Sequence, residues 1–77
     1  MLLDVIILSP TEVIFEGKAR SVVLPGEEGV FEVLPFHKHL LSRLISGKLL
    51  VDTEVFPIRR GIAKVNRNKV TVIMEKE

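Results

Sequence analysis

The chain has 77 residues, contains no cysteine and carries a formal net charge of +1. This length suits a single domain, which buries only about 60% of the surface that its unfolded chain exposes and therefore depends on a compact apolar core. The lack of cysteine excludes a disulfide framework and a cysteine-ligated zinc site.

The N-terminal stretch MLLDVIILSP is apolar, but it does not have the pattern of a signal peptide. No basic residue precedes the apolar run, Asp4 interrupts it, and no small-residue cleavage site follows it. No stretch approaches the roughly 20 continuous apolar residues of a membrane-spanning helix. We therefore expect a soluble, cytoplasmic chain that keeps its N-terminus and is not itself inserted into a membrane.

Apolar residues follow the period of β-strands along most of the chain. The stretch KVTVIME places Val70, Val72 and Met74 on one face and Thr71 and Ile73 on the other. Turn residues recur at short intervals and separate short strands. The predicted strands lie near residues 2–8, 12–17, 19–25, 29–34, 41–46, 48–52, 54–59, 61–66 and 69–75. We expect an all-β fold, a flattened β-sandwich or barrel of about 8–10 short strands in two sheets.

Three local features qualify this pattern. The stretch LLSRLI at residues 40–45 could also form a helical turn. Pro57 interrupts a strand pattern, which indicates an edge strand or a bulge. We expect Val23 and Val72 to face the core, so that an aspartate at either position would prevent folding by burying an unpaired charge.

The least regular stretch is LPGEEGVFEVLPFHKHLL, residues 24–41. Its segment from Pro25 to Gly29 has two glycines but lacks the lysine and the following helix of a phosphate-binding loop. Glu27 and Glu28 would also repel an anion. We interpret this segment as a tight acidic hairpin turn in which a glycine adopts a positive φ.

No constellation in the chain predicts catalysis or a bound cofactor. His37 and His39 could share a face, but two ligands are too few for a metal and Glu32 is the only evident third. We therefore predict two solvated loop histidines. The serines do not lie in a nucleophile-elbow context.

A run of basic residues lies in the second half of the chain, and its members are Arg59, Arg60, Lys64, Arg67 and Lys69. Single-strand nucleic-acid binders of the barrel type combine such charges with stacking aromatic rings. This chain has no Trp or Tyr. We interpret the run as a solvated or partner-contacting basic edge. A free-standing β-barrel that binds nucleic acid or a peptide there remains the alternative function.

Charge is distributed unevenly between the two parts of the chain. Residues 1–36 hold two basic and six acidic residues, a net charge of −4, and residues 37–77 hold nine basic and four acidic residues, a net charge of +5. Two faces that meet different partners would explain this asymmetry. Consecutive strands with different solvated edges would explain it equally well.

As a whole, the sequence resembles the N-terminal β-sandwich of the epsilon subunit of F-type ATP synthases. The matching pieces occur in the family's order: LDVIILSPTEVIFEGKARSVVLPGEEGVFEVLP, PFHKHLL, SGKLLV, RGIAKV and NKVTVIME. The most specific element is V-x-L-P-G-x-x-G at residues 22–29, followed by an apolar strand, a proline, one residue, a histidine and a leucine pair. The resemblance covers nearly all 77 residues.

The resemblance implies a non-catalytic subunit of the rotating central stalk. Such a domain grips the gamma subunit, rests on the loops of the membrane-embedded c-ring and contacts the alpha/beta head through the complex. It couples proton or sodium transport to ATP synthesis and hydrolysis. The implied location is the cytoplasmic side of the bacterial plasma membrane, as a peripheral membrane protein, with no cofactor, no nucleic acid and no membrane insertion. Carried over by position, the residues that contact the c-ring are Glu27, Glu28, Gly29, Val30, Phe31, Glu32 and His37.

The chain also departs from the family's pattern. Relatives commonly have glycine at the position of Glu32 and Gly-His-Ala-Pro at residues 36–39, so Phe36 and Lys38 enlarge and charge the contact edge. Epsilon subunits usually continue into a helical hairpin that inhibits ATP hydrolysis and in some members binds ATP. This sequence ends at Glu77, directly after the last predicted strand. We therefore expect one epsilon-type domain over residues 1–77, without the helical domain and its inhibitory role. Either the natural protein is a short epsilon form, which the initial methionine and the charged EKE tail favour, or the sequence is a truncated piece of a longer subunit.

Overall fold

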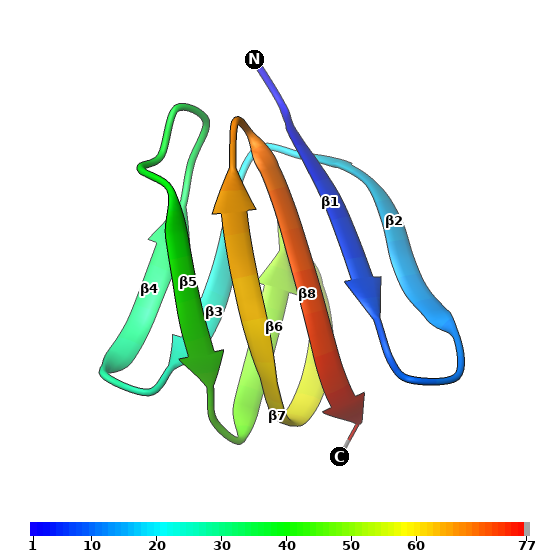
Figure 1. Cartoon of the computed structure of the whole chain (residues 1–77). Coiled ribbons are helices and arrows are strands. Elements are labelled where there is room, and N and C mark those ends of the chain that lie inside the picture. Colours follow the sequence, from blue (N-terminus) through cyan, green and yellow to red (C-terminus); the bar gives the residue numbers. More distant parts are fainter. Residues whose placement is uncertain (77) are drawn as a thin grey trace.

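The computed structural model describes residues 1–76, which form eight strands and no helix (Figure 1). The strands are β1 (Leu3–Leu8), β2 (Val13–Ala19), β3 (Val22–Gly26), β4 (Gly29–Val33), β5 (Leu40–Leu44), β6 (Gly47–Val51), β7 (Glu54–Asn66) and β8 (Lys69–Lys76). The expected all-β fold is therefore confirmed, with eight strands in place of nine. Within residues 1–76 there is no helix that could cross a membrane.

The strands form one hydrogen-bonded network that is arranged as two layers (Figure 1). The first layer contains β2, β1, β8, the second half of β7 and β5, in that order. The second layer contains β4, β3, β6 and the first half of β7. All the pairs are antiparallel except β1 with β8, which run parallel. The two faces that these layers turn toward each other enclose the core.

A single long hairpin passes through both layers. β5 and β6 together run antiparallel to β7, with β5 beside residues 61–65 and β6 beside residues 54–58. β7 descends in one layer, bends and ascends in the other, and its pairing with β8 shifts register between Ile58 and Arg60 (Figure 1). Gly61 follows this bulge, and a Cβ there would lie 2.5 Å from the carbonyl oxygen of Ile73. The bend therefore requires a residue without a side chain.

The core consists of alternating residues from both layers. On β8, Val70, Val72 and Met74 are buried as the sequence predicts, and β1 contributes Leu3, Val5 and Ile7. No polar or charged side chain within residues 1–76 is buried. At about 25 cal/mol per Å² of buried apolar surface, these aliphatic side chains are the main source of stability in so small a domain. The complete set of buried residues is Leu3, Val5, Ile7, Ala19, Val22, Leu24, Val33, Leu44, Leu49, Val51, Ile58, Ala63, Val65, Val70, Val72 and Met74.

The structure corrects two expectations from the sequence. Val23 does not face the core, because Val22 and Leu24 are fully buried and Val23 lies half-buried on the opposite face of β3. The predicted strands at 54–59 and 61–66 are one strand, because the chain passes through the bulge without a break in pairing. The bulge lies two residues from Pro57, where the proline indicated an irregularity.

The stretch at residues 40–45 was compatible with a helical turn, and most of it forms strand β5. Leu40 to Leu44 pair residue by residue with Val65 to Gly61 of β7. A full ladder of backbone hydrogen bonds and the burial of Leu44 outweigh the weak local preference for a helix.

Candidate partner-binding groove

The acidic turn between β3 and β4 has the geometry that its glycines predicted. Gly26 pairs with Gly29, so Glu27 and Glu28 form a two-residue loop, and Gly29 has a φ of 130°. At Gly26, a Cβ would lie 2.7 Å from the ring of Phe31. One glycine therefore supplies the backbone conformation, and the other makes room for the aromatic ring.

Backbone hydrogen bonds fix this turn against the end of β5. The N–H of Glu27 donates to the carbonyl oxygen of Arg43 at 3.0 Å, and the N–H of Ile45 donates to that of Pro25 at 2.9 Å. Neither Glu27 nor Glu28 forms a salt bridge within residues 1–76. The turn therefore holds two solvated carboxylates in a rigid frame, where a partner can reach them.

The side chains of β4 alternate between the core and the solvent. Val33 is buried and Phe31 packs against the core, whereas Val30 and Glu32 point outward. Val30 is 74% exposed, so its apolar side chain is available to a partner. β4 pairs only with β3 within the described chain, so its other side is open.

A groove with a volume of about 570 Å³ lies between β4 and β5. The two strands are neighbours because β3 pairs with β5 at a single position, Gly26 with Leu44, beyond which the layers diverge. We call this feature the β4–β5 groove, and its lining residues are Gly26, Glu27, Glu28, Gly29, Val30, Phe31, His37, Leu40, Leu41, Ser42 and Arg43.

Six of the seven residues that the family resemblance placed at a partner interface line this groove. They come from the acidic turn and β4, and from His37 in the loop that follows β4. The seventh, Glu32, is exposed on the outer side of β4 and does not line it. The sequence interpretation missed the opposite wall, Leu40 to Arg43, which only the pairing of β5 with β7 brings into position. The leucine pair after His39 was the one local signal for that wall.

The groove does not form a metal site. Nδ1 of His37 lies 2.8 Å from the carbonyl oxygen of Lys38, which fits a local main-chain contact. Within residues 1–76, no three His, Asp or Glu side chains gather closely enough to hold a metal ion.

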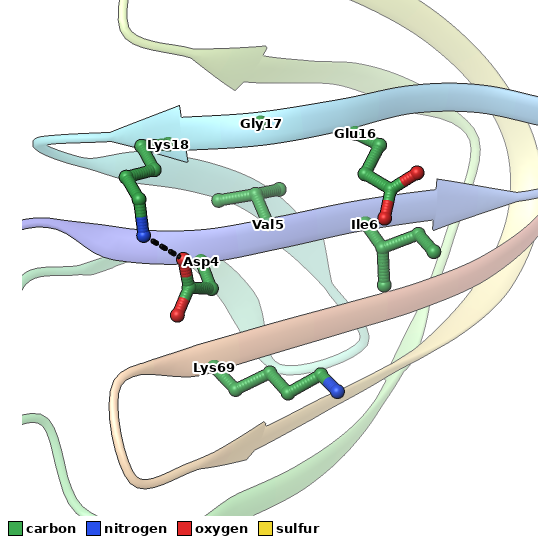
Figure 2. A pocket seen from close by; sticks show the side chains of 7 residues that line it. All are labelled: Asp4, Val5, Ile6, Glu16, Gly17, Lys18 and Lys69. Carbon is green, nitrogen blue, oxygen red and sulfur yellow. Dashed lines mark hydrogen bonds and ion pairs between the residues drawn. The ribbon is translucent and has the colours of Figure 1, made fainter.

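A second depression lies between β1 and β2, where Gly17 pairs with Val5 and has no side chain to cover it (Figure 2). Its volume is about 370 Å³. Lys18 forms a salt bridge with Asp4, and Lys69 extends away from that pair (Figure 2). With two acidic and two basic side chains around an open, shallow floor, this depression has no charge bias toward a ligand.

Among the basic residues that the sequence grouped together, Lys64 and Lys69 line one small depression, but Arg60 lies apart from them. Arg60 lies at the bend of β7 and forms a salt bridge with Glu75 at 2.8 Å. Lys64 lies four residues further along the strand, about 13 Å away, and Arg67 occupies the turn beyond it. The five basic residues therefore do not form one continuous surface, and the alternative of a nucleic-acid-binding barrel is not supported.

Comparison with known proteins agrees with the all-β fold. A family model described as "ATP synthase, Delta/Epsilon chain, beta-sandwich domain" matches residues 2–76. The ATP synthase epsilon chain of Sulfurimonas denitrificans is 40% identical over 90% of this chain and 57% of its own length. That of Campylobacter lari is 40% identical over 94% of this chain and 59% of its own length. The chain thus spans somewhat more than half the length of these relatives.

Solved structures show the same fold. A chain of the mitochondrial ATP synthase of Euglena gracilis, solved with its OSCP, F1 and c-ring parts, matches 95% of this chain with a TM-score of 0.87 and 22% identity, over 50% of its own length. A chain from the central stalk and c-ring of the Tetrahymena thermophila mitochondrial enzyme matches 96% with a TM-score of 0.80 and 14% identity, over 63% of its own length. On the match of the family model over residues 2–76, the chain belongs to the family of delta/epsilon chain β-sandwich domains of ATP synthase.

Proposed function

We propose that this chain is a non-catalytic subunit of the rotating central stalk of an F-type ATP synthase. In this role it links the gamma subunit to the c-ring and couples ion flow to ATP synthesis and hydrolysis. It contacts the alpha/beta head only through the assembled complex. The bacterial relatives support a peripheral position on the cytoplasmic side of the plasma membrane.

The observation that carries this proposal is the convergence of two separate segments on one groove. The acidic turn with β4, and His37 six residues beyond Phe31, line the same surface. Glu27 and Glu28 are solvated there without a salt-bridge partner within residues 1–76. We infer that the β4–β5 groove faces the polar loops of the c-ring and that its carboxylates pair with basic groups on them.

A different surface suits the gamma subunit. Four apolar residues lie side by side across β2, β1, β8 and β7, on the face that points away from the core. Ile62 is 50% exposed and Ile73 is 54% exposed, which leaves apolar area uncovered in the isolated chain. We call this set the apolar row, and its members are Val13, Leu8, Ile73 and Ile62.

The shape of this face also favours a large partner. A hollow of about 570 Å³ contains Ile62 and Ile73 with Met74 and Pro10, and charged side chains surround it. An apolar centre within a polar rim is the usual anatomy of a protein–protein interface. We infer that the apolar row packs against gamma.

The two surfaces adjoin each other. Glu27 and Arg43 line both the β4–β5 groove and the hollow over the apolar row. A partner on one surface would therefore be close to a partner on the other. This arrangement supports simultaneous contact with gamma and with the ring.

Titration calorimetry with the gamma subunit and the c-ring of the same organism tests the proposal. Binding to gamma should show a negative heat-capacity change and little dependence on salt, because it buries apolar surface. Docking of the resulting complex on the detergent-solubilised ring should weaken as salt screens the carboxylates. Failure to bind gamma and the ring at low salt would contradict the proposal.

A further inference from the structure

A hydrogen bond joins the loop after β4 to the turn between β7 and β8, two segments far apart in the sequence. The N–H of Phe36 donates to the side-chain oxygen Oδ1 of Asn68 at 2.6 Å. The β4–β5 groove does not include either residue. The bond nevertheless acts on the residue next to Phe36, His37, which does line the groove.

The backbone of Phe36 adopts a conformation that a bulky residue rarely takes. Its φ is 68°, in the left-handed region, which is strained for an aromatic residue and persists only when its surroundings hold it. The side chain of Phe36 is 78% exposed, so packing in the core does not hold it. Two contacts account for this conformation: the hydrogen bond that the N–H of Phe36 donates to Asn68, and the turn that the N–H of His37 closes on Leu34.

Asn68 is itself well anchored. Arg67 and Asn68 have φ values of 51° and 62°, as in the two-residue hairpin turns that match the twist of antiparallel strands. The N–H of Asp4 donates to the carbonyl oxygen of Asn68 at 2.8 Å, which ties the turn to β1. The side chain of Asn68 therefore reaches from an anchored turn in the first layer to the loop that follows β4 in the second layer.

The loop closes on itself directly after Phe36. The N–H of His37 donates to the carbonyl oxygen of Leu34 at 3.2 Å, which makes a turn around Pro35 and Phe36. The direction in which the chain leaves Phe36 therefore determines where His37 lies. With Phe36 held, the half-buried His37 stays at the groove.

We propose that Asn68 is a positioning residue for the β4–β5 groove. Its side-chain oxygen holds the backbone of Phe36, and through it His37, in the geometry that the groove presents to a partner. The inference rests on the proposed function insofar as that partner is the c-ring. Its structural part, the ordering of the loop by Asn68, stands without a partner.

Two substitutions at one position separate the roles of the side chain and the backbone. Asn68→Gly removes the acceptor but accepts the positive φ of the turn, so the hairpin should persist. Asn68→Asp retains an acceptor oxygen and serves as the matched control. Amide hydrogen exchange, followed by NMR on the full chain, reports on Phe36 and His37. The amide of Val72 in β8 serves as the internal standard for the fold.

In Asn68→Gly, we expect exchange at Phe36 and His37 to accelerate about fivefold, which corresponds to the loss of one hydrogen bond, while Val72 is unchanged. Affinity for the c-ring should fall by a similar factor, and Asn68→Asp should stay within about twofold of the original chain. Unchanged exchange at Phe36 in Asn68→Gly would overturn the inference. Faster exchange with undiminished ring affinity would overturn the positioning role.

The two proposals fail in distinguishable ways. If the unsubstituted chain does not bind the ring, the proposed function of the groove fails. The exchange measurement then still decides whether Asn68 orders the loop, because it needs no partner.

Discussion

The β4–β5 groove and the apolar row differ in how the chain builds them. The groove depends on main-chain geometry: a two-residue turn between paired glycines and backbone bonds from that turn to β5. The apolar row consists of side chains that regular strand pairing places next to one another. Substitutions in the row should therefore change partner affinity through lost apolar contact. In the groove, one substitution can remove a charge and a different one can loosen the backbone, so the two contributions to partner affinity can be measured separately.

The substitution with the largest expected effect unfolds the chain and therefore abolishes both surfaces. Val72→Asp places an unpaired charge in a fully buried site and should cost about 3–5 kcal/mol, most of the stability of so small a domain. Circular dichroism and thermal melting would show a chain that is unfolded or nearly so at 25 °C. The matched control is Val23→Asp, which lies half-buried on the other face of β3 and should remain folded. A folded Val72→Asp would contradict the assigned core.

The next effect should be confined to the apolar row. Ile73→Asp replaces a half-exposed apolar side chain at the centre of the row, so stability should change by less than about 1 kcal/mol. Affinity for gamma should fall about thirtyfold, as expected for an interface residue worth about 2 kcal/mol. Calorimetry with gamma measures this loss. Val30→Asp, at an apolar and more exposed position in the groove, should leave gamma binding unchanged.

A smaller effect is expected at the acidic turn. Glu28→Lys reverses a solvated charge, and an exposed ion pair is worth only about 0–1 kcal/mol, so ring affinity should fall by no more than about fivefold. The loss should shrink at high salt. The melting temperature should stay within about 4 °C of the original. A larger fall in melting temperature would show that the carboxylate of Glu28 stabilises the fold.

The smallest effect concerns Phe36. Phe36→Gly keeps the N–H that bonds to Asn68 and removes the strain of a left-handed aromatic residue, which is about 1–2 kcal/mol. The greater freedom of glycine in the unfolded chain offsets part of this gain. We expect the free energy of unfolding to rise by less than about 1 kcal/mol, as measured by urea denaturation. A clear loss of stability would show that the exposed ring packs more than the structure indicates.

Regular alternation made most of the fold predictable, and the exceptions have identifiable causes. On β8 the buried Val70, Val72 and Met74 alternate with residues that are polar except for Ile73, so the core face was evident. On β3 the adjacent valines 22 and 23 offer no such contrast, and the wrong one was assigned to the core. The sequence did not reveal that β7 is continuous, because the segment Arg59-Arg60-Gly61 reads as a turn. In the structure this segment contains a bulge, and the strand continues through it.

The candidate groove was predictable on one side only. The acidic turn has a local signature in its glycines and glutamates, which predicted the turn itself. The family resemblance supplied the interface residues from Glu27 to Phe31, and these five line the groove. The opposite wall comes from β5, whose position depends on pairing with a strand some 20 residues away. The bond between Phe36 and Asn68 spans 32 residues, and no local pattern announces it.

The long hairpin that bends across both layers has a mechanical consequence. Two stacked sheets that are joined only by side-chain packing can slide past each other under a sideways load. Here the strands of the hairpin continue from one layer into the other, so such a load is carried along covalent backbone and its ladder of hydrogen bonds. A domain built in this way should transmit a twisting force from one face to the other with little internal slip, and should come apart in one step.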